Sequence, residues 1–163
     1  MSDWNTYAEQ VKNRFDYDTN DWAVHNVCSG AGIYGQDGSV WGVSADMPEL
    51  KTYTHDLEDM DGSIEKIEVN EVLCAVEAAG GNRSPTKAGI RMGGKKYMLT
   101  FSQDGFAKLV CSGGGACVGK TVTGVVVGLW SKEGKDSNGA FQNDESTYLI
   151  VKEMVDYLKG TGM

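Results

Sequence analysis

Apolar residues recur at helical spacing at both ends of the chain. Near the N-terminus, intervals of three and four residues predict a helix over 3–15, with Asp3 as its N-cap. Its apolar stripe comprises Trp4, Tyr7, Ala8, Val11 and Phe15. Near the C-terminus a second stripe predicts a helix over 146–159, and Gly160 is a natural stop for it.

Between these helices, short apolar runs alternate with turn signals and predict antiparallel strands. Asp37-Gly38 is a hairpin turn between strands expected over 24–33 and 40–44. The same alternation predicts further strands over 89–92, 96–102, 106–111, 116–121 and 125–130. Hairpin-linked strands form an antiparallel sheet that needs one face covered, and the terminal helices are the obvious cover. We therefore predict one α+β domain over 1–163.

Three smaller elements are expected before the later strands. A short helix is predicted over 48–51. An acidic hairpin follows over 53–69 and turns at Asp61-Gly62. Asn70 is expected to cap a helix that runs to Ala79.

The net charge and the lengths of the apolar runs argue against nucleic-acid binding and against a membrane span. The chain has 163 residues, with 15 basic and 23 acidic side chains and a formal net charge of −8. Phosphate backbones repel such a surface, so we expect no general nucleic-acid binding. No apolar run approaches the roughly 20 residues of a membrane span. The first residues lack a basic and then apolar leader, so we expect a cytoplasmic protein.

Residues that carry catalysis or bind metals are sparse. Cys28, Cys74, Cys111 and Cys117 have no metal-binding spacing, and we expect them to be small buried apolar residues. The two histidines are not spaced as metal ligands, and the acidic run 56–61 lacks the pattern of a calcium loop. We therefore predict no cofactor, no metal and no enzymatic activity.

One segment matches a nucleotide-binding motif. Gly114–Thr121 fits the pattern G-x-x-x-x-G-K-T. In a working motif a helix begins directly after Lys-Thr and directs its N–H groups at phosphate. Here the β-branched run 122–127 follows, which is typical of a strand. We interpret the segment as a glycine-rich turn with its exit strand. Nucleotide binding through Lys120 is kept as the alternative function, and a non-catalytic scaffold domain as a third.

Large aromatic side chains are concentrated near the chain ends. Trp4 and Tyr7 lie one helical turn apart, Trp41 lies in the first hairpin, and Tyr157 lies near the end of the last helix. Packing in the core is one explanation. If the two helices pack side by side, however, these rings form one exposed patch. Such a patch suits a proline-rich ligand, because the polyproline helix is preformed and loses little entropy on docking.

Several segments, in this order and spacing, resemble a profilin, a small protein that binds actin monomers. They are 2–7, 31–33 with 37–41, 93–97, 114–121 and 155–162. The acidic hairpin followed by Val69-Asn70-Glu71 resembles an insertion in apicomplexan profilins, which suggests a protist source. The resemblance implies a central antiparallel sheet with the terminal helices on one face and smaller helices on the other. It also implies a cytoplasmic, cytoskeletal monomer.

The resemblance implies a groove for proline-rich segments, such as those of formins, between the terminal helices. Its residues here are Trp4, Tyr7, Trp41, Tyr157, Leu158 and Met163. The family often ends in an aromatic residue, whereas this chain ends in Met163. A thioether packs on a ligand but has no flat ring, so we expect weaker polyproline binding.

The resemblance also implies an actin-binding face. The matching positions are Lys96, Met98, Lys120 and Glu153. A basic residue that is common before the Gly-rich turn falls near Cys111 here. Phosphoinositide binding is a further family property. The candidates for it are Lys95, Lys96, Lys108 and Lys120. The net charge of −8 disfavours it, because anionic headgroups require clustered basic residues.

Overall fold

A seven-stranded antiparallel sheet forms the centre of the computed structural model, which describes residues 4–16 and 19–163. The strand order is β4-β3-β11-β10-β9-β8-β7. The strands are β3 (Gly30–Gly35), β4 (Val40–Val43), β7 (Ile90–Met92), β8 (Lys95–Gln103), β9 (Phe106–Cys111), β10 (Gly114–Lys120) and β11 (Gly124–Ser131). Consecutive strands from β7 to β11 are neighbours, as hairpin connections predict.

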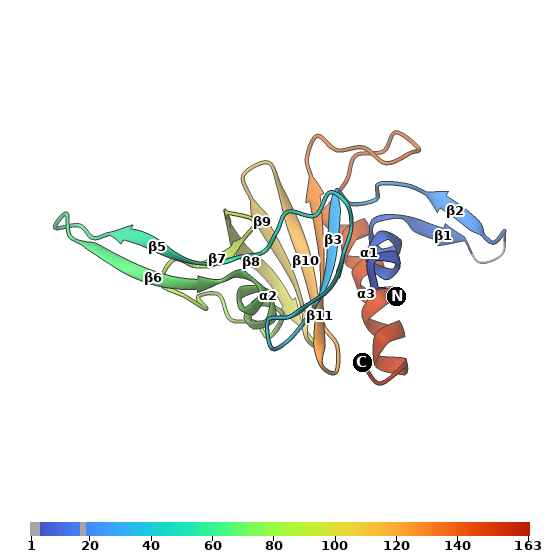
Figure 1. Ribbon diagram of the computed structural model, residues 1–163. Helices are drawn as coiled ribbons and strands as arrows, with labels where there is room; N and C mark the ends of the chain where they lie inside the picture. The colour runs from blue at the N-terminus through green and yellow to red at the C-terminus, as the bar shows by residue number, and fades with distance from the viewer. Residues whose placement is uncertain (1–3, 17–18) are drawn as a thin grey trace.

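Helices cover both faces of this sheet. α1 (Trp4–Lys12) and α3 (Asp144–Gly160) lie together on one face, and α2 (Glu71–Ala79) lies on the other (Figure 1). Side chains alternate along β11, so that Val125 and Val127 belong to the core on the α2 side and Val126 to the core on the α3 side. The predicted α+β class and the placement of the terminal helices are confirmed. Within the described residues α2 is the one helix on the opposite face.

Two glycines let α3 approach the sheet closely. A Cβ atom on Gly128 would lie 2.9 Å from Val151 Cγ2, and one on Gly119 would lie 2.8 Å from Val155 Cγ2. Both distances are shorter than ordinary van der Waals contact. The absence of side chains at these positions therefore sets the depth at which α3 packs. Asn143 caps α3 by accepting a hydrogen bond from Ser146 N at 2.8 Å.

The first helix is shorter than its pattern predicts. It ends at Lys12, and a small hairpin of β1 (Arg14–Asp16) and β2 (Asp21–Val24) follows. Asn13 directs this change: its Nδ2 donates to Glu9 O at 3.0 Å, and its Oδ1 accepts from Asn26 N at 2.8 Å. The predicted cap Asp3 lies outside the described residues.

The segment over 48–51 forms no helix, so the short helix predicted there is wrong. Its last residue, Lys51, exchanges hydrogen bonds with Glu71 instead. Lys51 N donates to Glu71 Oε1 at 2.9 Å, and Glu71 N donates to Lys51 O at 3.0 Å. This pairing fixes the end of the segment to the start of α2. Asn70 caps α2 through a bond from Leu73 N at 3.1 Å, as predicted.

The acidic hairpin forms as expected and projects from the sheet (Figure 1). β5 (Thr52–Glu58) pairs with β6 (Ile64–Asn70) in continuous register. The base is held by the buried carboxylate of Glu71, which accepts hydrogen bonds from Tyr53 Oη at 3.1 Å and Gly94 N at 2.9 Å. One side chain thus joins the hairpin, α2 and the β7–β8 turn.

Three of the four cysteines are core residues. Cys28, Cys74 and Cys117 are buried, as predicted, and Cys111 is partly exposed. Burial raises the pKa of the Cys28 and Cys117 thiols to about 12, so both remain protonated near neutral pH. In the described part of the chain, no helix has the length and apolar character needed to span a bilayer.

Candidate functional site

Four aromatic rings from three elements meet on the α1–α3 side of the sheet. Trp4 lies 4.8 Å from Trp41 and 5.5 Å from Tyr7, and Tyr7 lies 5.7 Å from Tyr157, measured between ring centroids. We call these four residues the aromatic cluster. The two Tyr7 contacts are edge-to-face, an arrangement favoured by the ring quadrupoles. The rings form one continuous surface.

The aromatic cluster is accessible to solvent. Tyr157 is 51% exposed, while Trp4, Tyr7 and Trp41 are half-buried against the core on the α3 side. Each half-buried ring therefore has one packed face and some surface that a ligand can reach. The expectation that these rings meet near the chain ends without being sealed inside agrees with this geometry.

Glycines form the support under the cluster. Trp41 lies over two of them: a Cβ on Gly124 would be 2.8 Å from its Cζ3, and one on Gly35 would be 3.0 Å from its Nε1. Gly42 lies directly against the backbone of Trp4. These glycines allow α1 and Trp41 to sit on the sheet without a layer of side chains between them. Their spacing in the sequence gave no signal of this role.

Polar contacts fix α1 against β4 and the loop after it. Asn5 Oδ1 accepts from Val43 N at 3.0 Å, and Glu9 Oε1 accepts from Ala45 N at 2.9 Å. Lys12 Nζ pairs with Asp46 at 2.6 Å. These contacts run along one side of the helix and set its rotation. They therefore orient the rings of the aromatic cluster.

The other two residues expected in the groove differ in exposure. Leu158 is 1% exposed and belongs to the core beneath the helices, so it supports the cluster from below and does not form its surface. Met163 is half-buried against the same core. Its carbonyl oxygen accepts hydrogen bonds from Thr121 Oγ1 at 2.8 Å and Thr123 N at 2.7 Å. The β10–β11 turn thus holds the last residue in place.

A second exposed surface lies on the α3 side of β8 and β9, beyond the edge of the helix. Met98 and Val110 are cross-strand partners and are 68% and 36% exposed. Phe101 lies 6.0 Å from Tyr148 of α3 between ring centroids. We call Met98, Phe101, Val110 and Tyr148 the outer sheet patch. Only Met98 was expected in a binding surface. Met98 and Phe101 are three residues apart on β8, and the register shift between Leu99 and Phe101 brings them to one face, so strict alternation in the sequence gave no signal for Phe101.

One lysine borders the outer sheet patch in a fixed position. Lys108 Nζ lies 5.5 Å from the Phe101 ring centroid and 5.1 Å from that of Tyr148. Asp144 and Glu145 at the start of α3 lie 3.8 and 3.9 Å from the same nitrogen. The ammonium is therefore held over two rings and balanced by two carboxylates.

The remaining residues expected on the actin-binding face are dispersed. Lys96 is exposed and shares a face of β8 with Met98. Lys120 pairs with Val125, and directly paired residues share a face of the sheet. Lys120 therefore lies on the α2 side, opposite to Met98, at the end of β10. Glu153 lines a groove with Val24, on a different side of α3 from Lys152, whose ammonium lies over Phe106.

The glycine-rich motif has no geometry for holding phosphate. Gly114–Lys120 is strand β10, and its glycines are buried between β9 and β11. After Thr121 the chain enters a turn and then β11, so no helix N-terminus follows the Lys-Thr pair. The glycine-rich part of the motif, from Gly114, is thus already part of the strand, and Lys120 is the last residue of that strand. This geometry excludes a working phosphate loop.

Comparison with known proteins assigns the fold and the family. The profilin family model matches residues 4–163. A profilin of Tetrahymena pyriformis is 28% identical over 167 residues, covering 99% of both chains. The crystal structure of Acanthamoeba castellanii profilin II superposes with a TM-score of 0.62 at 19% identity, covering 98% of this chain and 99% of that one. Schizosaccharomyces pombe profilin gives 0.61 at 17% identity, with the same coverage.

The chain belongs to the profilin family. Profilins are non-enzymatic proteins of the cytoplasm and cytoskeleton that bind monomeric actin and proline-rich ligands. The protein is accordingly an actin-binding regulator of actin polymerisation.

Proposed function

We propose that the aromatic cluster is the site at which this protein binds proline-rich segments. The observation that carries the proposal is the contact of four rings from α1, β4 and α3 on one accessible surface. Flat rings pack against the faces of a polyproline helix. The ligand's backbone is preordered, so little conformational entropy opposes binding. Met163 extends this surface at the chain end.

Tryptophan fluorescence tests this site, because Trp4 and Trp41 lie within it. Adding polyproline to the purified protein is expected to shift the emission of the wild type. Tyr157→Ala removes the most exposed ring and is expected to reduce the affinity about tenfold or more, as for an aromatic hot spot. Phe141→Ala is the matched control, because Phe141 is 59% exposed in the loop before α3, outside the cluster. Equal affinities of the two variants would reject the assignment.

We further propose that the outer sheet patch contacts monomeric actin. Met98, Phe101 and Val110 are exposed apolar residues on adjacent strands, and contiguous apolar surface of this kind marks interaction sites. Lys96 lies on the same face and offers a charge for acidic residues of actin. Lys120 and Glu153 lie outside this patch, so we assign them no central role.

Pull-down or calorimetric titration with monomeric actin tests the patch. Met98→Asp places a charge at its most exposed apolar position and is expected to weaken binding by about tenfold or more. Val122→Asp is the control, because Val122 is 58% exposed in the β10–β11 turn. An unchanged affinity for Met98→Asp would contradict the assignment, as would an equal loss in both variants.

We infer that the protein forms and breaks no covalent bond itself. The non-enzymatic character of the family and the strand geometry of the glycine-rich motif support this inference. Phosphoinositide binding is disfavoured, because two carboxylates face Lys108 and Lys120 lies far from Lys96 along the sheet. Hydrolysis of a nucleotide by the purified protein, lost in Lys120→Ala, would be evidence against this inference.

A further inference from the structure

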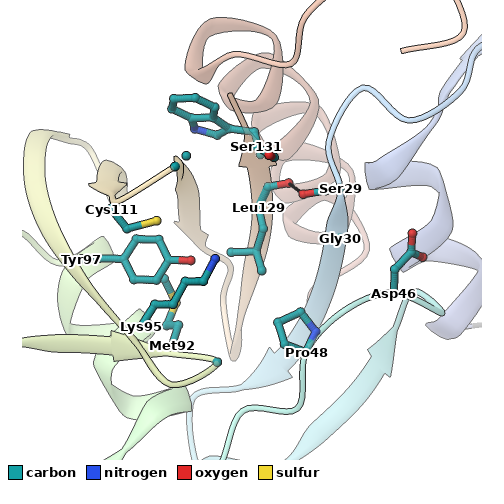
Figure 2. Close-up of a pocket in the computed structure, with 14 residues that line it drawn as sticks. Ser29, Gly30, Asp46, Pro48, Met92, Lys95, Tyr97, Cys111, Leu129 and Ser131 are labelled. Atoms are coloured by element: carbon teal, nitrogen blue, oxygen red, sulfur yellow. Dashed lines mark hydrogen bonds between the residues drawn. The ribbon is translucent and has the colours of Figure 1, made fainter. Parts of the chain in front are cut away.

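A cavity of about 480 Å³ lies at one end of the curled sheet, on the side of α2. Strands from opposite halves of the sheet supply its walls (Figure 2). Its apolar wall includes Met92, Tyr97 and Leu129, which belong to the core on the α2 side. The aromatic cluster lies on the other side of the sheet. The volume is within the range of small-molecule sites, which are common at the mouths of curled β-sheets.

A specific contact between two loops closes one wall of the cavity. The loop after β4 meets the β7–β8 turn where Pro48 packs against Gly93. A Cβ on Gly93 would lie 3.0 Å from Pro48 Cγ, and the φ angle of Gly93 is +59°. Both the space and the backbone conformation therefore favour glycine there. This contact joins the two ends of the sheet and closes one wall of the cavity.

Most polar side chains around the cavity already have partners. Asp46, its one acidic residue, pairs with Lys12 at 2.6 Å. The Ser29 hydroxyl donates to Leu129 O at 3.1 Å. The Ser131 hydroxyl accepts from the following loop. The Asp46 carboxylate and the Ser29 proton are therefore already engaged, whereas the Ser131 hydroxyl keeps its own proton to donate.

Two further donors are available. The Lys95 ammonium has no ion-pair partner among the described residues and lines the cavity. The Tyr97 hydroxyl points into the same space, and Figure 2 shows both side chains directed from β8 towards Leu129. Burial, followed by the neighbouring Cys111 thiol, raises the pKa of Tyr97, so its hydroxyl stays protonated and can donate. A single cation with a neutral donor above apolar walls matches a ligand with one negative charge.

We propose that this cavity binds a small organic carboxylate with an apolar body. Its carboxylate is held by Lys95 Nζ and Tyr97 Oη, and its apolar part packs against Met92 and Leu129. The site is independent of the surfaces assigned to actin and proline-rich ligands.

Titration with 3-phenylpropionate, followed by methyl resonances of Met92 and Leu129, tests the proposal. We expect saturable shifts in the wild type. Lys95→Met keeps the aliphatic stem and removes the charge, and it is expected to weaken binding about tenfold, the loss of one charge-assisted hydrogen bond. Lys96→Met is the matched control, because the adjacent lysine faces the other side of β8. It should bind like the wild type.

The neutral amide 3-phenylpropanamide has nearly the same shape as the acid but no negative charge, so it tests the contribution of the ligand's charge. It is expected to bind more weakly than the acid and to be insensitive to Lys95→Met. Thermal unfolding of all variants confirms that they fold. The proposal is overturned if 3-phenylpropionate leaves these resonances unshifted up to its solubility limit. It is also overturned if acid and amide bind equally, or if Lys95→Met and Lys96→Met have the same effect.

Discussion

Replacing Gly42 by alanine is expected to damage the aromatic cluster without altering any of its rings. The added Cβ would lie 2.7 Å from Asn5 N and closer still to the Trp4 carbonyl. These are backbone atoms, so no rotamer change relieves the contact, and α1 must move by roughly 1 Å to restore ordinary packing. Overpacking of this kind costs about 1–3 kcal/mol of unfolding free energy. Because Trp4 is 4.8 Å from Trp41, that movement also opens the ring contact.

Two measurements check this expectation. Thermal unfolding should show a lower Tm, by about 2–4 °C for each kcal/mol in a protein of this size. Titration with polyproline should show a reduced affinity, while binding of actin at the outer sheet patch is preserved. Gly160→Ala is the control, because a Cβ there meets no atom within 4 Å. If Gly42→Ala keeps wild-type stability and wild-type polyproline affinity, the close support of α1 by β4 is refuted.

Three further outcomes are expected. Deleting 55–67 should leave the sheet folded but lower the unfolding free energy in chemical denaturation by about 2 kcal/mol, through loss of buried Ile67. In timed alkylation followed by mass spectrometry, partly exposed Cys111 should react before Cys117, whose raised pKa keeps it protonated. Asn70→Ala should cost about 1 kcal/mol in chemical denaturation, because α2 loses its cap; an unchanged midpoint would contradict that role.

Local patterns predicted most of the fold. The amphipathic stripe of the last helix, the hairpin turns and the cap at Asn70 are properties of short segments, and each appears in the structure. The first helix was predicted too long because its apolar stripe continues to Phe15. Tertiary contacts of Asn13 with Glu9 and Asn26 end it sooner. The position of Lys51, at the end of the segment predicted as a short helix, is likewise set by Glu71, a partner distant in sequence.

The candidate surfaces were harder to predict than the fold. Convergence of the four rings depends on how two helices pack on the sheet, and the resemblance to profilins supplied that arrangement. The face on which Lys120 lies depends on strand register, which pairs it with Val125 on the α2 side. A shift of one residue would reverse that face. Matching single positions to a family motif does not show on which face of the sheet a residue lies. The observed pairing of the strands does.

Helix α3 contributes to both proposed surfaces. Tyr148 near its start belongs to the outer sheet patch, and Tyr157 near its end belongs to the aromatic cluster. At 1.5 Å per residue, these two side chains are separated by about 14 Å along one helical axis. The helix therefore holds the two proposed binding surfaces at a fixed separation. An actin monomer and a proline-rich tail held by the same molecule would keep a constant offset, so delivery of the monomer would depend on the flexibility of the tail and not on that of the profilin.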